Sequence, residues 1–267
     1  MRTGAWNVLV LAAGRGPDDP MAKAYQVTHK CLVEVGGEPM LRRVIRTLVD
    51  HPGIGSVTVC IERRELLDEA LGPLAGNVGF VLPQESAARS ANAALRAEPR
   101  FPWLITTGDH PLLTHEMLQH FLTEATASKA DLSAGLATAE TILARFPQAQ
   151  RTFLTFGRDR VSGCNLFALT SERALKALDF WHHLESVRKK PWRLIGAFGP
   201  VALLRFAVGL LTLDSAFALA SRRLGLIARP VLMPFAEAAV DVDKPADKEL
   251  AEKILAERSA LEHQVVL

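Results

Sequence analysis

The order of apolar and polar positions along the chain predicts strands that alternate with helices. Short apolar or β-branched runs are typical of buried strands, whereas apolar residues three and four positions apart are typical of amphipathic helices. Strands are expected near residues 6–13, 57–61, 78–82, 103–107 and 228–235, and helices near residues 39–48, 65–71, 87–96, 114 onward, 214–224 and 245–262. This alternation predicts an α/β fold with a mostly parallel central sheet, covered by helices on both faces to give three layers.

Two segments depart from this alternation. Residues 152–156 and 165–169 are strand-like runs separated by a turn-prone Gly-Arg-Asp sequence, which predicts an antiparallel excursion. Further on, a helix that Ser171 is expected to cap precedes a basic cluster at residues 188–193 and an apolar stretch at 194–213. We therefore expect a single domain, residues 1–267, with a helical insertion at about 180–225.

The apolar stretch of the insertion leaves two hypotheses open. It makes a poor transmembrane span, because Arg205 near its middle costs about 2.5 to 3.5 kcal/mol, and Pro200 and three glycines interrupt it. On a helix from Val201 the less apolar positions form one narrow stripe, so the helix is expected to bury most of its surface. Under one hypothesis it packs against its own domain or a second copy. Under the other, it docks on an anionic membrane together with the basic cluster.

Composition narrows the class of protein. With 49% apolar and 22% charged residues and a net charge of +2, the chain is globular, and no basic excess indicates a nucleic-acid partner. Its three cysteines, Cys31, Cys60 and Cys164, lack metal-ligand spacing. The first residues lack the pattern of a signal peptide, and together these features predict a cytoplasmic protein.

Candidate chemistry follows the predicted strands, at the edge where parallel sheets bind ligands. The first such segment reads Leu11-Ala12-Ala13-Gly14-Arg15-Gly16, in which small residues let a phosphate or a base approach the main chain. Arg15 and Lys30 add cationic donors for phosphoryl oxygens. A generic glycine-containing turn with basic surface residues explains the same pattern, since neither the Walker motif nor Gly-x-Gly-x-x-Gly is present.

Aspartates follow two further strands. Asp109, in the sequence Gly108-Asp109-His110-Pro111, is placed to hold Mg²⁺ together with a substrate phosphate, although a turn-forming aspartate fits equally well. Asp241 and Asp243 alternate before the last helix, so both carboxylates are expected to face a cation from one side. Asp243 also lies two residues before Pro245, where it would favour the start of that helix instead.

Together these segments resemble the MobA-like nucleotidyltransferase family, which has a Rossmann-like fold. The resemblance rests on residues 11–16 with Lys30, on Val35-Gly36-Gly37-Glu38-Pro39-Met40-Leu41, on residues 108–111 and on residues 241–247. It covers residues 6–170 and 228–256 but not the helical insertion. Residues 17–25 also depart from the compact Arg-Met-Gly run that the family keeps between the glycines and the lysine, and Lys244 stands where a threonine is common.

The resemblance implies transfer of a nucleoside monophosphate from an NTP to a small phosphorylated acceptor, with release of pyrophosphate. Asp109 with Asp243 or Asp241 would hold Mg²⁺, and Arg15 and Lys30 would act on the departing phosphates. The implied nucleotide-binding residues are Leu11, Ala12, Ala13, Gly14, Gly16, Gln84, Ser86 and Ser90, and the implied acceptor-side residues are Gly163 and Asn165. A polar loop that enters a helix explains residues 84–92 equally simply, and a strand bulge explains Gly163.

Two other classes of protein stay open. A glycosyltransferase that uses a nucleotide sugar would also need Mg²⁺ and aspartates, but it would favour an Asp-x-Asp after the middle strand, where this chain has Thr107. A non-catalytic protein that binds nucleotides or docks on membranes would explain the poorly matched loop and the insertion.

Overall fold

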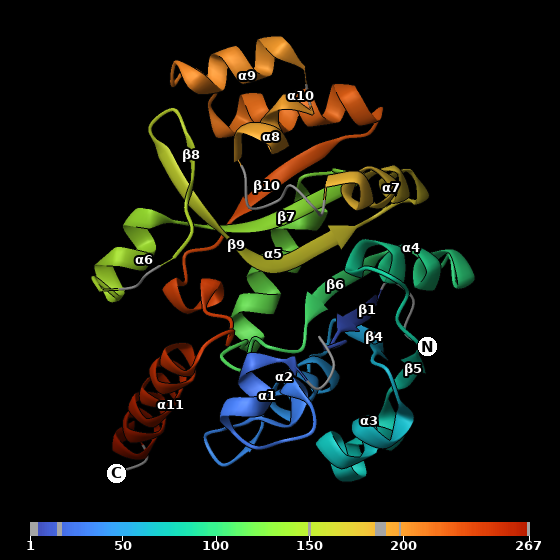
Figure 1. Ribbon diagram of the computed structural model, residues 1–267, viewed down its shortest axis with the longest axis vertical. Coiled ribbons are helices and arrows are strands. Elements are labelled where there is room, and N and C mark those ends of the chain that lie inside the picture. Colours follow the sequence, from blue (N-terminus) through green and yellow to red (C-terminus); the bar gives the residue numbers. More distant parts are fainter. Residues whose placement is uncertain (1–4, 15–17, 149–150, 185–190, 198, 266–267) are drawn as a thin grey trace.

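An eight-stranded sheet forms the centre of the molecule (Figure 1). The computed structural model describes residues 5–14, 18–148, 151–184, 191–197 and 199–265. Along the sheet the strands follow the order β10 (Ala228–Leu232), β7 (Leu132–Thr138), β9 (Asp159–Leu169), β6 (Trp103–Thr107), β1 (Trp6–Leu11), β4 (Ile54–Cys60) and β5 (Gly79–Val81), and β8 (Leu154–Phe156) pairs with β9. The predicted α/β class with a mostly parallel sheet is confirmed.

Strand β9 supplies the predicted antiparallel excursion. It forms a hairpin with β8 around Gly157, whose φ of 59° suits a glycine, and it lies antiparallel to both β6 and β7. Strands β1, β4, β5 and β6 are parallel, and β7 and β10 are parallel to each other. Because β9 reverses direction between β6 and β7, these six strands all end at one edge of the sheet.

Helices α2 (Met40–Val49), α3 (Arg64–Leu71) and α5 (His115–Ala127) cover one face of the sheet. Each has apolar residues at helical spacing, and these pack with alternate strand residues such as Val8, Val10 and Leu104, all 0% exposed. Helices α4 (Ala87–Ala97) and α7 (Leu175–Leu184) cover the other face, where Leu9 and Ile105 belong to a smaller core. The sheet with these helices makes the expected three layers.

Strand β7 and helices α1 (Pro20–Ala24) and α6 (Ala139–Arg145) are among the elements that were not predicted from the sequence. Strand β7 is rich in serine, alanine and glycine, which have low strand propensity, and it forms because β9 and β10 pair with it on both sides. Helix α1 begins at Asp19, whose buried carboxylate accepts from the backbone N–H groups of Met21 and Ala22. Helix α6 follows β7, and α11 (Pro245–Val265) closes the chain.

The predicted insertion is helical. Its elements after α7 are α8 (Pro191–Gly196), α9 (Pro200–Ala207) and α10 (Leu213–Leu224), which gather at one end of the molecule (Figure 1). Ser171 occupies the position before a 3₁₀ turn that leads into α7, but its hydroxyl donates to Asp131 at 2.5 Å rather than accepting a helix N–H. The other carboxylate oxygen of Asp131 accepts from the N–H of Ile227 at 2.8 Å. One aspartate thus joins both ends of the segment between β9 and β10.

Burial in α9 differs from the expectation. Ala202, on the stripe of less apolar residues, is 1% exposed, whereas Val201 and Leu204 are 66% and 65% exposed. The helix ends at Ala207, and Val208 and Leu210 beyond it are also exposed. The hypothesis that the domain itself buries most of this surface is therefore wrong, because only the side of α9 with Ala202 and the half-buried Phe206 packs on the domain. Burial against a second copy stays a prediction. The helices that the structure describes include none with the length and apolar character needed to cross a membrane.

Candidate active site

Asp109 lies at the carboxyl end of β6, immediately beyond a close approach of the chain to α2 and to the loop after β1. Gly108 separates it from the strand, and a Cβ added at Gly108 would lie 2.9 Å from Leu41 Cδ1 and 3.1 Å from Ala12 Cβ. Only glycine therefore fits without displacing a neighbour. The carbonyl of Asp109 accepts from the N–H of Val242 at 2.9 Å, so the Asp109 turn is fixed to the segment that carries Asp241 and Asp243.

Lys30 joins two of the predicted aspartates. Its Nζ lies 2.7 Å from Asp109 Oδ2 and 2.6 Å from Asp243 Oδ1, and its side chain is 16% exposed. Burial alone would lower the pKa of Lys30, but the ion pairs and hydrogen bonds with Asp109 and Asp243 hold that pKa above its usual range. Two carboxylates and one ammonium leave a local charge of about −1, which favours a further cation.

Asp241 faces a different partner. Its Oδ1 pairs with Arg151 Nη1, and its Oδ2 lies 3.4 Å from Asn165 Nδ2. Burial raises the pKa of Asp241, the nearby Asp109 and Asp243 add to this, and Arg151 opposes it. Asp241 and Asp243 therefore contact different cationic side chains, and a metal role for Asp241 remains a prediction.

The N–H groups at the start of α11 point to Asp247 rather than to Asp243. Asp247 Oδ2 accepts from the N–H of Asp243 at 3.2 Å and from that of Lys244 at 2.9 Å. This is the contact expected of a residue in the first turn of a helix. The carboxylate of Asp243 is turned toward Lys30 instead, which favours its site role over the capping alternative.

The loop after β1 presents backbone groups at the same edge. The N–H of Ala12 donates to the carbonyl of Cys60, and the N–H of Gly14 donates to Glu62 Oε1 at 2.7 Å. His29 Nε2 lies 3.1 Å from the other oxygen of Glu62. Burial raises the pKa of Glu62, but hydrogen bonds from His29 and Gly14 lower it below its usual value overall. The Gly14 N–H thus already has an anionic partner within the chain, and phosphate binding by this loop stays a prediction.

Glu62 and His29 were not predicted, although Glu62 follows β4 as closely as Asp109 follows β6. Gly14 has a packing role as well, because a Cβ there would lie 2.5 Å from His29 Nε2. Leu11, Ala12 and Ala13 take the predicted place at the end of β1. The predicted residues Arg15 and Gly16 lie outside the described part of the chain.

The polar residues before α4 mainly shape their own loop. Ser86 is the N-cap of α4 and accepts from the N–H of Arg89 at 3.3 Å. Ser90 is 4% exposed; its hydroxyl accepts from the N–H of Gln84 and donates to the carbonyl of Ser86, both at 2.8 Å. The side chain of Gln84 is exposed. The structure thus favours the simple loop for the two serines, and base binding by the three residues stays a prediction.

Gly163 and Asn165 lie on a bulged part of β9 beside Asp241. The register between β7 and β9 shifts between Ala134 and Leu136, and Asn165 in the bulge has a φ of 52°. A Cβ added at Gly163 would meet no heavy atom within 4 Å, so this position faces open space. The bulge brings Asn165 close to Asp241. Arg151 also pairs with Asp241 but was not predicted, because it lies in no motif.

The arrangement fits a hard divalent cation. Asp109 Oδ1 is buried and, within the described part of the chain, has no hydrogen-bond partner. The other oxygen of the Asp109 carboxylate pairs with Lys30, which also pairs with Asp243. Carboxylate oxygens are the ligands that Mg²⁺ prefers. Among the described residues, no group of three or more His, Cys, Asp or Glu side chains is close enough to hold a metal. Two carboxylates would leave further positions of such an ion to water and to substrate phosphate.

A strand-end site with two aspartates, a half-buried lysine and a loop of small residues after β1 is typical of an enzyme that acts on phosphate groups. Residues 8–183 match the model of the MobA-like NTP transferase domain, and the chain belongs to this family of nucleotidyltransferases. The match ends within the insertion. It does not extend to residues 228–256, which the sequence resemblance also covers, so the role of Asp241 and Asp243 stays a prediction. The match favours a nucleotidyltransferase over the glycosyltransferase and the non-catalytic alternatives.

Individual proteins agree with this assignment. The chain is 31% identical over 144 residues to the bifunctional protein GlmU of Neisseria meningitidis serogroup C, which covers 52% of this chain and 29% of that protein. It is similar to the structure of a hypothetical transferase from Thermus thermophilus, at 29% identity and a TM-score of 0.77 over 91% of this chain and 99% of that one. A 4-diphosphocytidyl-2C-methyl-D-erythritol synthase from Anaerococcus prevotii shares the fold, at 12% identity and a TM-score of 0.59, over 95% of this chain and 99% of that one. The chain thus spans less than a third of the curated relative that it matches.

Proposed function

We propose that this nucleotidyltransferase transfers a nucleoside monophosphate from an NTP to a phosphorylated small-molecule acceptor and releases pyrophosphate, with Mg²⁺ as cofactor. The observation that carries the proposal is the bridge from Lys30 to both Asp109 and Asp243 at the carboxyl edge of the sheet. It brings together a cation for phosphate oxygens and two carboxylates for a metal, from three segments far apart in the sequence.

The reaction needs no covalent intermediate with the enzyme. A phosphate oxygen of the acceptor forms a bond to the α-phosphorus, and the bond from that phosphorus to the oxygen that bridges to the β-phosphate breaks. Bound Mg²⁺, held by Asp109 and Asp243, would supply charge neutralisation and orientation of the phosphates. The main contribution of the chain is therefore to position two substrates and to compensate their negative charge.

Individual residues take distinct parts in this proposal. Lys30 keeps its proton at neutral pH, since its two carboxylate partners more than offset the effect of burial on its pKa, and it would present its positive charge to the departing pyrophosphate. The Gly14 N–H, which now holds Glu62, would bind the nucleotide when Glu62 turns aside. Gly163 leaves space for the acceptor next to Asn165 and Asp241.

Pyrophosphate release tests the proposal. Each NTP is incubated with the protein, MgCl₂ and a small-molecule fraction of a cell extract, and pyrophosphate is measured with and without the extract. We expect release with one NTP that needs both the extract and the metal, and that Asp109→Asn abolishes. Asp68→Asn on α3, a solvent-exposed aspartate paired with Arg64, is the matched control and should keep full activity. If no NTP gives release that depends on both metal and extract, the proposal is wrong.

The outer face of α9 is exposed and apolar, which is typical of a surface that contacts a membrane or another protein. Val201, Leu204, Val208 and Leu210 remain as an exposed apolar surface. The basic cluster at residues 188–193 precedes it in the sequence, and residues 188–190 lie outside the described part of the chain. We propose that this face rests on an anionic membrane, and a second copy of the chain is the alternative occupant.

A further inference from the structure

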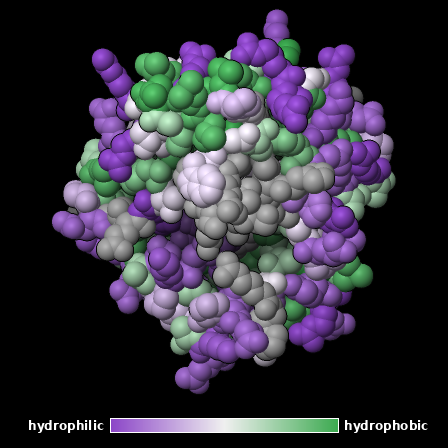
Figure 2. Space-filling view, turned by 45° about the horizontal axis from the view of Figure 1, so that its top comes forward, coloured by the Kyte–Doolittle hydropathy of each residue, from purple (hydrophilic) through white to green (hydrophobic). Residues whose placement is uncertain are grey.

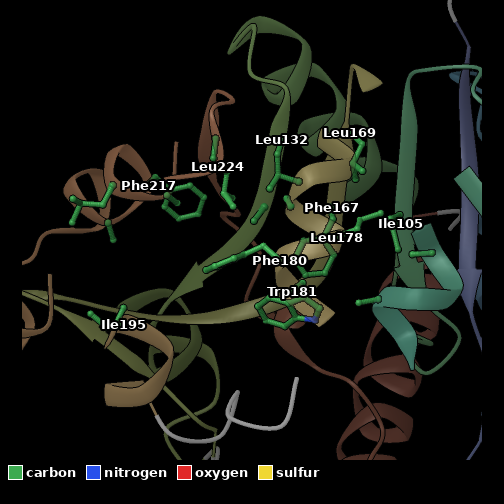
Figure 3. Close-up of a pocket in the computed structure, with 18 of the residues that line it drawn as sticks. Ile105, Leu132, Phe167, Leu169, Leu178, Phe180, Trp181, Ile195, Phe217 and Leu224 are labelled. Carbon is green, nitrogen blue, oxygen red and sulfur yellow. The ribbon is translucent and has the colours of Figure 1, made fainter. Parts of the chain in front are cut away.

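A large apolar cavity lies between the sheet and the helices of the insertion (Figure 3). Its volume is about 290 Å³. Ile105, Leu132 and Phe167 line it from the strands, and Leu178, Trp181 and Phe217 from the helices. Trp181 and Phe167 remain 37% and 38% exposed although they belong to its wall. Packed protein interiors contain few voids larger than a water molecule, so this one is not ordinary packing.

The chemistry of the wall disfavours polar occupants. All of the described residues around the cavity are alanine, leucine, isoleucine, phenylalanine or tryptophan. Apart from the indole N–H of Trp181, these side chains offer no hydrogen-bond partner to a polar molecule. A sugar or a nucleotide base would therefore lose its hydrogen bonds to water without replacement, at a large cost in free energy. A hydrocarbon group would lose none, and would gain from the burial of its surface.

The cavity adjoins the proposed site along three segments. Leu11 lines it and directly precedes Ala12, at the start of the loop that holds Glu62. Ala87 lines it and directly follows Ser86, the cap of α4. Phe167 lines it two residues after Asn165, whose amide reaches Asp241. The wall of the cavity therefore continues, within one or two residues along each of these three segments, into the proposed site.

We propose that the acceptor carries a hydrocarbon chain, and that this cavity binds it. The inference rests on the proposed transferase function and names the class of its acceptor: an alkyl or isoprenoid-like phosphate. The phosphate would lie at the strand edge near Asp241, and the hydrocarbon would extend between the sheet and α7 and α10. The insertion has the same chemistry on its outer face, since α9 lines the cavity with Ala202 and exposes Val201 and Leu204 on its other side.

A series of acceptors tests the proposal directly. Ethyl, butyl, hexyl, octyl and decyl phosphate are each supplied with the NTP and MgCl₂, and KM for the phosphate is obtained from pyrophosphate release. We expect KM to fall by about fourfold for each methylene group that enters the cavity, and to level off once the cavity is full. A KM that does not depend on chain length would overturn the proposal.

Two variants fill the cavity without disturbing the aspartates. Ala134→Phe on β7 and Ala220→Phe on α10 each add a phenyl group at a half-buried position of the wall. Both should abolish the advantage of octyl over ethyl phosphate and leave kcat and KM for ethyl phosphate unchanged. Ala127→Phe, at an exposed position of α5 on the opposite face, is the matched control and should keep the full advantage. Variants that are more stable yet keep the dependence on chain length would mark the cavity as a packing void, against the proposal.

A binding measurement separates this proposal from the proposed function. Equilibrium dialysis with radiolabelled octyl phosphate reports binding whether or not transfer occurs. Saturable binding that Ala220→Phe removes, without pyrophosphate release, would support the cavity and contradict the transferase reaction. Release with ethyl phosphate, without tighter binding of octyl phosphate, would support the reaction and overturn the cavity proposal.

Discussion

The two faces of the central sheet carry similar apolar residues, but one face is closely packed and the other borders a cavity. On the face under α2, α3 and α5, residues such as Val10 and Leu48 are completely buried against one another. On the opposite face, α4 and α7 close the core near β1 and β6, whereas toward β7 and β10 the covering helices leave the cavity open. Residues that alternate along one strand, such as Leu104 and Ile105, contribute to the two faces in turn. Hydrophobicity alone therefore does not separate a packed core from the wall of a cavity, because the elements that cover the apolar residues decide between the two.

Two leucine-to-alanine variants test whether the two faces of the sheet are packed differently. Leu48→Ala, on the closed face that α2, α3 and α5 cover, should reduce the free energy of unfolding by about 2 to 5 kcal/mol, because it leaves a cavity in a packed core. Leu219→Ala at the wall of the existing cavity should cost less than about 1 kcal/mol, since it enlarges a space that is already open. Urea unfolding measures both values. Equal losses would mean that the two faces are packed alike.

A substitution at the carboxyl edge of the sheet, where Asp109 lies, should change the activity rather than the stability of the protein. Asp109→Asn keeps the shape of the side chain but removes the charge proposed to hold Mg²⁺, while Lys30 retains its pair with Asp243. We expect pyrophosphate release to fall by about 10² to 10³-fold, with a melting temperature close to that of the parent protein. Full activity in this variant would contradict the metal role of Asp109.

A pH effect is expected from the closed face. His51 is 3% exposed, and burial with the nearby His115 lowers its pKa below the usual value. A histidine with a lowered pKa in the folded state contributes stability above its unfolded pKa, and that contribution is lost as the pH falls below about 6.5. Urea unfolding from pH 7.5 to 5 should therefore give a falling free energy of unfolding. His51→Asn can still accept from the N–H of Gly53 but does not titrate in this range, and its curve should be flatter.

The smallest effect concerns the outer face of the insertion. The protein should sediment with anionic vesicles at low salt and less so at high salt or with neutral vesicles, since each basic residue adds only about 1 kcal/mol near the surface. The double variant Val201→Ser, Leu204→Ser should weaken this binding. Leu261→Ser on α11 replaces an equally exposed leucine and should not. Protein that stays in the supernatant throughout would end the membrane proposal, and analytical ultracentrifugation would then test for a dimer.

The space-filling view shows why this outer face is tested separately. Apolar residues gather at the top of the molecule in Figure 2, on the side of the insertion, whereas charged and polar side chains surround them. A patch of this kind is typical of an interaction surface. It is distinct from the cavity, which lies under the inner faces of the same helices.

Much of the fold could be predicted because periodicity reflects burial. The spacing of Met40, Leu41, Val44, Ile45 and Leu48 predicted α2, and the apolar run from Trp103 to Thr107 coincides with β6. Strand β7 could not be predicted, because its stability comes from partners distant in sequence rather than from its own residues. The prediction that the domain buries most of α9 was wrong for a related reason: the pattern of apolar residues along a helix does not say which side packs on a partner.

The candidate site divides in the same way. Lys30, Asp109 and Asp243 could be predicted because each lies in a recognisable motif, and the structure brings them together. Arg151 and His29 could not, since single residues outside motifs reach the site only through the tertiary fold. Ser86 and Ser90 were predicted to help bind the base. In the structure their hydroxyls form hydrogen bonds with the backbone of their own loop, and base binding stays a prediction.

The link from Asp131 to Ser171 and Ile227 has a consequence for how such a protein can evolve. Leu169 and Ala228 both lie opposite Leu132, so the long segment between β9 and β10 leaves and re-enters the sheet at points two strand spacings apart, about 10 Å. Helix α7 has to be kept, because Leu175 and Leu178 pack on the core of the sheet, but α8 and α9, the exposed part of this segment with closely spaced ends, tolerate changes in length. Under the proposals above, exchange of α8 and α9 between the same two strands would change the acceptor and leave the strand edge that carries Asp109 unchanged.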